Sequence, residues 1–97
     1  MPTDRIAHVL IHGRVQGVGF RAWIHHQAEL HGLKGWVRNR RDGSVEAVFS
    51  GPGGMVEVML KACHHGPSGC LVQLVEPVEG AGPELEDVQG FEIRRTV

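Results

Sequence analysis

Three glycines lie in residues 13–21, whose sequence is GRVQGVGFR, and an arginine, Arg21, ends the stretch. Glycine tolerates left-handed backbone conformations, so a glycine-rich loop can turn several N–H groups toward one point. Such N–H groups attract anions, and an arginine can bind two oxygens of one phosphate. The stretch therefore predicts a phosphate-binding site that includes Gly17, Gly19 and Arg21. A plain tight turn would also account for the glycines.

Two familiar glycine motifs do not fit this stretch. The nucleotide-binding motif GxxxxGK[ST] is excluded, because no lysine in the chain is followed by serine or threonine. The dinucleotide motif GxGxxG is also absent, although a strand, a glycine loop and a helix are expected in that order. The loop is thus predicted to bind a phosphoryl group without belonging to either nucleotide-binding class.

Chemistry on a bound phosphate needs a second group, which positions the attacking nucleophile. Asn39 lies late in a predicted strand, where asparagine is disfavoured. Its carboxamide can both donate and accept a hydrogen bond, so it could orient a water molecule without titrating. Asp42 and Gly43 follow closely, and Asn39 could equally belong to their turn.

The elements around the loop follow from the spacing of apolar residues. Residues 5–12 alternate as a strand, with Ala7, Val9 and Ile11 on one face. Residues 20–31 have a helical period, with Gly32 as the expected stop. The apolar side of this helix contains Phe20, Trp23, Ile24, Ala28 and Leu30. The glycine loop therefore ends at a helix N-terminus, where free N–H groups and the helix dipole favour an anion.

The rest of the chain completes a βαββαβ order, with a possible short strand added at the end. Strands are expected at 34–40 and 44–50 around Asp42-Gly43, a helix at 55–65, and strands at 70–78 and 91–95. The acidic segment 79–90 is expected to be an exposed loop. This order predicts a single α+β domain over residues 1–97. Its fold would be a ferredoxin-like sandwich, an antiparallel sheet with two helices packed on one face.

Charge and composition favour an anionic ligand and give no sign of a membrane-spanning segment or a metal site. Residues 1–41 carry a net charge of +5 and residues 42–97 a net charge of −6, so the first half favours an anionic ligand. No leader peptide and no membrane-spanning stretch is recognisable. Cys63 and Cys70 fit neither a redox pair nor a zinc site, which is typical of a cytoplasmic protein. The histidine pairs His25-His26 and His64-His65 lack ligand spacing, so the histidines are expected to be exposed and no metal site is predicted.

Two motifs together resemble the acylphosphatase family. These are GRVQGVGFR at 13–21 and GWVRNRRDGSVEA at 35–47, and the resemblance extends more weakly over residues 6–93. It implies the ferredoxin-like fold and hydrolysis of a small acyl phosphate to a carboxylate and inorganic phosphate, which would also inhibit. It implies no metal and no cofactor. The residues 69–71, Gly-Cys-Leu, differ from the usual family pattern.

The resemblance also assigns roles to the residues of the two motifs. Arg21 would bind the phosphate and Asn39 would position the nucleophilic water. The other predicted phosphate-binding residues are Arg14, Val15, Gln16, Gly17 and Val18, with Gly19 and Phe20 leading into the helix. Two interpretations are open for the neighbouring cations Arg38, Arg40 and Arg41. They could form a solvated strand face and turn, or they could attract an anionic substrate.

A nucleic-acid-binding module is the main alternative, because RNA-recognition domains share the ferredoxin-like order. Those domains stack bases on aromatic residues of the sheet, and Phe49 is the only candidate in the central strands. The isoelectric point of about 6.6 also argues against it. An accessory domain of a larger carbamoyl-transfer protein is a further alternative. We expect a monomer that binds neither nucleic acid nor membrane, because no apolar surface stripe is apparent.

Overall fold

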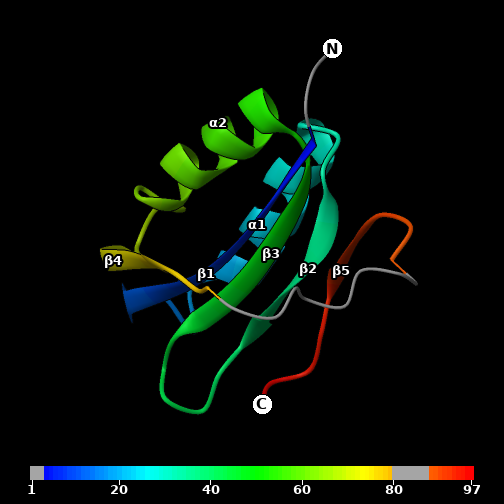
Figure 1. The fold of residues 1–97 in the computed structure, drawn as a ribbon. Helices are drawn as coiled ribbons and strands as arrows, with labels where there is room; N and C mark the ends of the chain where they lie inside the picture. Colours follow the sequence, from blue (N-terminus) through cyan, green and yellow to red (C-terminus); the bar gives the residue numbers. More distant parts are fainter. Residues whose placement is uncertain (1–3, 80–87) are drawn as a thin grey trace.

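The computed structural model describes residues 4–79 and 88–97. The elements follow the predicted order, with a short strand added at the end (Figure 1). They are β1 (Asp4–Arg14), α1 (Phe20–Leu30), β2 (Lys34–Asn39), β3 (Val45–Pro52), α2 (Gly53–Cys63), β4 (Leu71–Pro77) and β5 (Phe91–Ile93). Of the segment predicted as an exposed acidic loop, residues 80–87 lie outside the described residues. Neither described helix is long and apolar enough to cross a membrane.

The strands form one sheet in the order β4-β1-β3-β2-β5. The first four strands are antiparallel to their neighbours, as predicted. The prediction of a wholly antiparallel sheet is wrong for β5, which pairs in parallel with β2. β5 runs opposite to β4 but lies at the other edge of the sheet, beside a strand of its own direction. Residue types within a strand do not determine such a placement.

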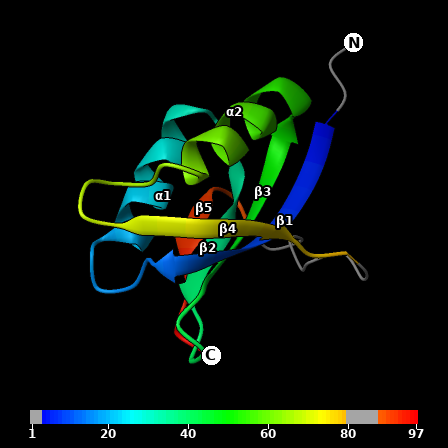
Figure 2. The same cartoon turned by 90° about the vertical axis from the view of Figure 1, so that its left-hand side faces the viewer.

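Both helices lie on one face of the sheet (Figure 2). The core between them is formed by residues that alternate along the strands and recur along the helices, including Ala7, Val9, Ile11, Phe20, Ile24, Ala28, Val37, Val45, Ala47, Phe49, Val56, Met59 and Cys63. The predicted apolar side of α1 is wrong at one position, because Leu30 is 67% exposed at the end of the helix. Trp23 is half-buried and packs edge-on against Phe20.

The opposite face of the sheet has a smaller buried cluster of Trp36, Val48 and Val88. The guanidinium groups of Arg38 and Arg94 lie 4.7 and 5.0 Å from the Trp36 ring centroid. Trp36 therefore packs against its own sheet. This face is opposite the helical face of the sheet. The loops that follow β1 and β2 are described next.

Candidate active site

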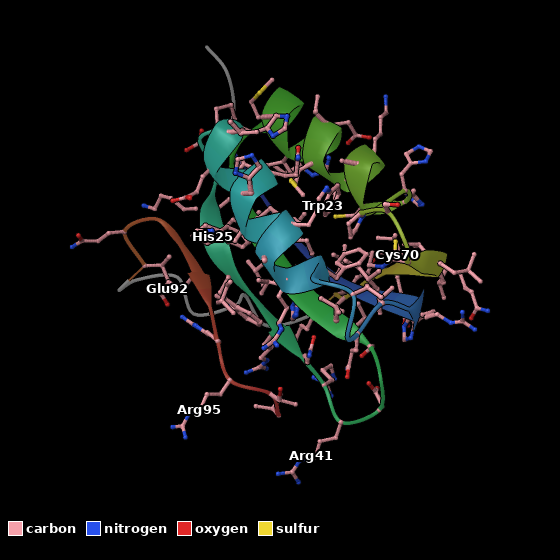
Figure 3. The ribbon with its side chains drawn as sticks, turned by 180° about the vertical axis from the view of Figure 1, so that it is seen from behind. Trp23, His25, Arg41, Cys70, Glu92 and Arg95 are labelled. Carbon is pink, nitrogen blue, oxygen red and sulfur yellow. The ribbon has the colours of Figure 1, made fainter. Side chains whose placement is uncertain are left out.

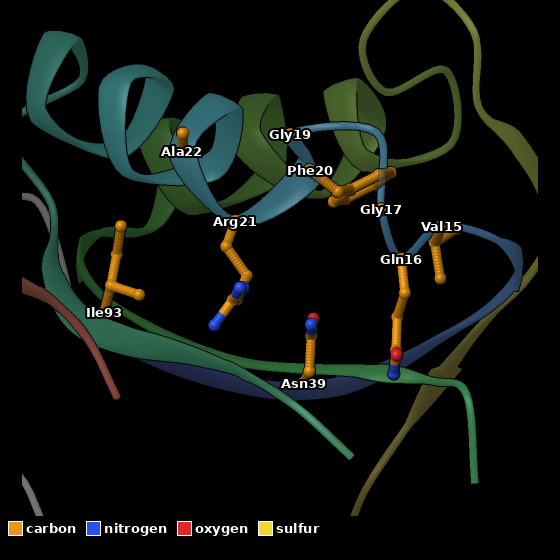
Figure 4. A pocket seen from close by; sticks show the side chains of 9 residues that line it. All are labelled: Val15, Gln16, Gly17, Gly19, Phe20, Arg21, Ala22, Asn39 and Ile93. Atoms are coloured by element: carbon orange, nitrogen blue, oxygen red, sulfur yellow. The ribbon is translucent and has the colours of Figure 1, made fainter. Parts of the chain in front are cut away.

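A pocket of about 250 Å³ opens where the 15–19 loop, the start of α1, the end of β2 and β5 meet (Figure 4). Its lining residues are Val15, Gln16, Gly17, Gly19, Phe20, Arg21, Ala22, Asn39 and Ile93. Three stretches distant in sequence, residues 15–22, Asn39 and Ile93, thus contribute to one cavity. Arg21 is the only charged residue among those that line it.

The 15–19 loop takes the shape that its glycines allow. Gly17 and Gly19 both have φ of +77°, a left-handed conformation that other residues rarely adopt. A Cβ atom at either position would meet no atom within 4 Å, so the backbone angle alone makes glycine suitable. Gly19 also precedes α1, and its carbonyl accepts the first helical hydrogen bond, from Trp23 N at 3.0 Å.

The backbone amides of this loop are available to a ligand. Within residues 4–79 and 88–97, the N–H groups of residues 16–22 donate to no protein acceptor. The last three belong to the first turn of α1, where N–H groups have no partner inside the helix and the helix dipole is positive. The upper wall of the pocket is therefore a row of uncommitted donors with positive potential.

Arg21 lies in the first turn of α1, and its guanidinium group points down into the pocket between Ile93 and Asn39 (Figure 4). No carboxylate in the described part of the chain forms an ion pair with it. A guanidinium group stays protonated near neutral pH and presents a planar fork of donors. The pocket therefore contains one fixed positive charge that is free to bind an anion.

Asn39 approaches Arg21 from the opposite wall (Figure 4). It is the last residue of β2 and pairs with Val45, so its side chain lies on the helical face with the core. Its backbone carbonyl accepts a hydrogen bond from Val97 N at 3.1 Å. The side-chain carboxamide makes no hydrogen bond to another described residue, which leaves its donor and its acceptor free toward the pocket.

Gln16 joins the loop to the turn after β2. Its Nε2 donates to the carbonyl oxygen of Arg40 at 2.7 Å and to that of Ser44 at 2.9 Å. The same two residues close the turn, because Arg40 N donates to the Ser44 carbonyl oxygen at 2.9 Å. The side chain thus bridges segments 24 and 28 residues away in sequence. This bridge was not predicted, since Gln16 was expected to offer only its backbone N–H.

The structure brings most of the predicted site residues together. Arg21 and Asn39 both line the pocket, with Val15, Gln16, Gly17, Gly19 and Phe20 of the predicted phosphate-binding set. Arg14 and Val18 do not line it: Arg14 is exposed at the end of β1, and Val18 packs partly against the core. Sequence reasoning missed Ala22 and Ile93. Ala22 follows Arg21 directly, whereas Ile93 enters only through the position of β5 beside β2.

The arginines near Asn39 divide between two environments. Arg38 Nε and Arg40 Nη1 lie 2.7 and 3.1 Å from Glu46 Oε1, and His8 Nε2 lies 2.6 Å from Glu46 Oε2. Burial raises the pKa of the Glu46 carboxyl, but the hydrogen bonds from Arg38 and His8 outweigh burial and lower that pKa overall. Arg41 is exposed at the turn and points into solvent (Figure 3).

The histidines only partly follow the prediction that they are exposed. His26, His64 and His65 are exposed, whereas His8, His12, His25 and His31 are half-buried. His12 Nε2 lies 2.8 Å from Glu76 Oε1, and His25 lies 3.5 Å from Glu29. Among residues 4–79 and 88–97, no three His, Cys, Asp or Glu side chains are grouped as metal ligands would be.

The aromatic residue on which a nucleic-acid site would depend is inaccessible. Phe49 is fully buried on the helical face of the sheet and stacks on Phe91, with 5.7 Å between ring centroids. A base cannot stack on a ring that both helices cover. Trp36, on the other face, is only 4% exposed. The geometry therefore does not favour the nucleic-acid-binding alternative.

Comparison with known proteins gives a consistent family assignment. The family model described as Acylphosphatase matches residues 7–93. Two relatives named acylphosphatase come from Azorhizobium caulinodans, 49% identical over 90 residues, and from a Synechococcus strain, 50% identical over 96 residues. The matches cover 93% of this chain and 95% of the first relative, and 98% of this chain and 99% of the second.

The fold agrees with that of a solved relative. The crystal structure of an acylphosphatase from Bacillus subtilis superposes with a TM-score of 0.83 at 33% sequence identity. The superposition covers 95% of this chain and 99% of that one. The similarity therefore extends over the whole arrangement of two helices on one sheet.

Proposed function

The chain belongs to the acylphosphatase family and is an acylphosphatase, and from this premise we propose how its pocket hydrolyses the carboxyl–phosphate bond of an acyl phosphate. One observation carries the proposal. Arg21 and Asn39 face each other across one pocket, next to backbone N–H groups that donate to no acceptor among the described residues. A phosphoryl group and a water molecule can be held there together.

The phosphoryl group binds between the loop and Arg21. N–H groups of the residues that line the pocket, among them Gln16, Gly17 and Gly19, donate to its oxygens from above, and the Arg21 guanidinium group takes further oxygens from the side. Negative charge that shifts among these oxygens in the transition state stays within reach of the same donors. Inorganic phosphate, the product, fits the same donors and is expected to compete with the substrate.

Asn39 places the nucleophilic water. Its free carboxamide can accept one hydrogen bond from the water and donate another to a phosphoryl oxygen, which orients the water toward phosphorus. Asn39 does not titrate, so it cannot act as a base, and an oxygen of the substrate takes the proton. Most of the rate enhancement then comes from orientation and charge stabilisation.

The carboxylate leaves without help from an acid or a metal ion. A carboxylate is a stable anion, so the departing oxygen needs no protonation, and the residues of the pocket include no carboxyl or imidazole group that could supply a proton. The acyl portion lies against Ile93 and Ala22, the apolar wall beside Arg21 (Figure 4). The account requires neither a metal nor a cofactor.

The physiological setting is part of the same proposal. We place residues 1–97 in a single domain that acts as a cytoplasmic monomer without nucleic-acid partners. Cys63 and Cys70 are free thiols, which suits a reducing compartment. Phe49 and Trp36 are buried, so neither face of the described sheet offers a base-stacking platform.

Phosphate release from benzoyl phosphate, with a chelator present, tests the proposed function. We expect turnover that the chelator does not reduce, and competitive inhibition by inorganic phosphate. Salt-dependent RNA binding without any hydrolysis would instead support the nucleic-acid-binding alternative. Turnover that disappears with the chelator and returns with a divalent cation would contradict the metal-free mechanism.

A further inference from the structure

The phosphate donors and the proposed water-positioning group lie on two separate pieces of structure, and the reaction requires these to keep a fixed separation. The loop and the first turn of α1 form one piece and carry the phosphate donors and Arg21. The β2–β3 hairpin forms the other and carries Asn39 at the end of β2. A water molecule held by one piece must reach a phosphorus atom held by the other.

Gln16 is the side chain that links the two pieces. Both hydrogens of its amide are used, one for the carbonyl oxygen of Arg40 at 2.7 Å and one for that of Ser44 at 2.9 Å. Arg40 directly follows Asn39, so the first of these bonds is made one residue from the proposed water-positioning group. Gln16 itself belongs to the loop that lines the pocket.

The hairpin turn is built so that this link is rigid. The Arg40 carbonyl oxygen also accepts from Gly43 N at 3.1 Å, and the Ser44 carbonyl oxygen also accepts from Arg40 N at 2.9 Å. The Asp42 carboxylate accepts from both the Ser44 N–H, at 2.9 Å, and the Ser44 hydroxyl, at 2.6 Å. Gln16 thus donates to a turn whose own hydrogen bonds already fix the two acceptors.

We infer that the Gln16 side chain is a positioning residue that sets the distance between the phosphate loop and Asn39. The inference rests on the proposed function and adds a role that the backbone of the loop does not have. Effective catalysis by orientation requires reacting atoms about 3–3.5 Å apart, and a misplacement of about 1 Å can cost on the order of 100-fold in rate. Gln16 controls that separation without needing to touch the substrate.

Loss of the Gln16 bridge should affect turnover and phosphate affinity differently. The phosphate donors and Arg21 lie together on the loop and α1, so loss of the bridge leaves their mutual geometry intact. Asn39 lies on the other piece and loses its alignment with phosphorus. A side chain without amide hydrogens should therefore lower kcat while the inhibition constant of inorganic phosphate stays nearly constant.

The test compares Gln16→Met and Gln16→Glu with the wild type, using benzoyl phosphate as substrate and inorganic phosphate as inhibitor. Both side chains have nearly the length of glutamine, and neither can donate to the two carbonyl oxygens. We expect kcat to fall about 10- to 100-fold in both variants, with the phosphate Ki changed by less than about threefold in Gln16→Met. In Gln16→Glu the added negative charge in the pocket lining raises the phosphate Ki, so the Ki criterion applies to Gln16→Met. Gln73→Met, at an exposed position on β4, is the matched control and should keep the wild-type kcat.

A second arm asks whether Gln16 acts through Asn39. Gln16→Met is combined with Asn39→Ala, and phosphate release is followed with enzyme in excess. If Gln16 serves only to place Asn39, the substitution changes the residual rate of Asn39→Ala by less than about twofold. An equal loss in both backgrounds would show a general structural role and would overturn the inference.

Two results of the first arm would also overturn it. One is an unchanged kcat in both Gln16 variants, and the other is a phosphate Ki of Gln16→Met that rises in parallel with the loss of kcat, because the loop itself would then be deformed. Failure of the proposed function looks different, since the wild type and Gln73→Met would themselves release no phosphate from benzoyl phosphate. The Gln16 variants therefore test the inference, whereas the wild type and Gln73→Met test the proposed function in the same experiment.

Discussion

Arg21 and Asn39 contribute different properties from opposite walls of the pocket. Arg21 brings a permanent charge and a fork of donors on the first turn of α1, next to backbone N–H groups that have no acceptor within residues 4–79 and 88–97. Asn39 brings a neutral group whose donor and acceptor are both free. Because neither side chain changes charge near neutral pH, the chemistry proposed for them depends on position and electrostatics alone.

Removing the Arg21 guanidinium group should impair both binding and turnover. We expect Arg21→Ala to lower kcat/KM for benzoyl phosphate by about 10²–10³-fold, because a donor to the developing charge is lost. The phosphate Ki should rise by roughly tenfold or more, since charged hydrogen bonds contribute about 1.5–3 kcal/mol. Steady-state kinetics check both numbers. Arg5→Ala, whose guanidinium group pairs with Glu57 away from the pocket, is the control; an unchanged phosphate Ki in Arg21→Ala would refute its role.

Ile93 should affect the acyl group and not the phosphate. The side chain is 47% exposed and forms the apolar wall beside Arg21. Ile93→Ala removes three methyl or methylene groups at about 0.8 kcal/mol each when fully buried, so kcat/KM for benzoyl phosphate should fall roughly 5- to 20-fold. Acetyl phosphate, which is too small to cover this wall, serves as the internal control. Equal losses for both substrates would rule out an acyl-binding role.

Individual site residues differ in how far the sequence can reveal them. Arg21 and the loop could be predicted because glycine density and a fixed charge point to an anion, and Asn39 because it is an unusual residue in a strand. The Gln16 bridge could not, since its partners are backbone carbonyl groups 24 and 28 residues away. Ile93 has an ordinary residue type for a strand, and only the position of β5 brings it to the pocket.

Beneath the pocket, the β2–β3 hairpin is stabilised from the opposite face of the sheet. Glu46 on β3 is 5% exposed and binds Arg38 on β2, Arg40 at the turn and His8 on β1. A buried carboxylate with several charged donors is strongly favoured in its ionised form. This cluster joins three strands at the end of the sheet where Asn39 lies, so it supports the hairpin.

The Glu46 cluster makes stability depend on pH in a defined direction. The folded protein lowers the pKa of Glu46 below the ordinary value of 4.5, so its stabilisation is complete above that value and is lost as the pH falls through the lower, folded pKa. We expect Glu46→Gln to lower the free energy of unfolding by about 1–3 kcal/mol at pH 7. The difference from wild type should shrink as the pH approaches 3.

Urea unfolding at pH 7, 5 and 3 measures this difference. Glu57→Gln is the matched control, because Glu57 pairs with Arg5 at 2.7 Å but is 52% exposed in its side chain. An exposed ion pair contributes little, so this variant should resemble the wild type at all three pH values. A Glu46→Gln penalty that stays constant from pH 7 to pH 3 would contradict the account.

The elements themselves could mostly be predicted from local pattern. Alternation identified the buried face of β1, and helical period identified both helices, because one face of each element is buried in the same core. Leu30 was misassigned since it lies in the last turn of α1, beyond the cover of the sheet. The parallel pairing of β5 with β2 depends on how the chain crosses from one edge of the sheet to the other, which no local pattern records.

At the scale of the molecule, the positive charge of the first half of the chain and the negative charge of the second half are brought together by the fold, so that some arginines are paired and others are not. Of the arginines near Asn39, Arg38 and Arg40 are paired with Glu46 on the far face. Arg41 and Arg95 are exposed and point into solvent, and neither forms an ion pair with a described residue (Figure 3). Arg41 extends from the turn just beyond Asn39, so among these arginines its charge is the one available to attract an anionic substrate.

Substrate capture should therefore weaken with salt, and Arg41 should account for part of the effect. We expect kcat/KM for benzoyl phosphate to fall as ionic strength rises from 10 to 300 mM, since exposed charges are screened over about 10 Å at 0.1 M. Arg41→Gln should flatten this dependence while kcat stays constant. Lys61→Gln, an exposed site on α2, makes the same charge change as a control. Identical salt dependence in both variants would exclude a special role for Arg41.

The most direct test of the central claim is the kcat of Asn39→Ala for benzoyl phosphate, measured with the phosphate Ki in the same protein. If Asn39 orients the water while Arg21 and the loop bind the phosphate, kcat falls by about 10²-fold or more, because the water is no longer oriented. The phosphate Ki should stay within about threefold of wild type, since Arg21 and the loop are untouched. A wild-type kcat in Asn39→Ala would contradict the account.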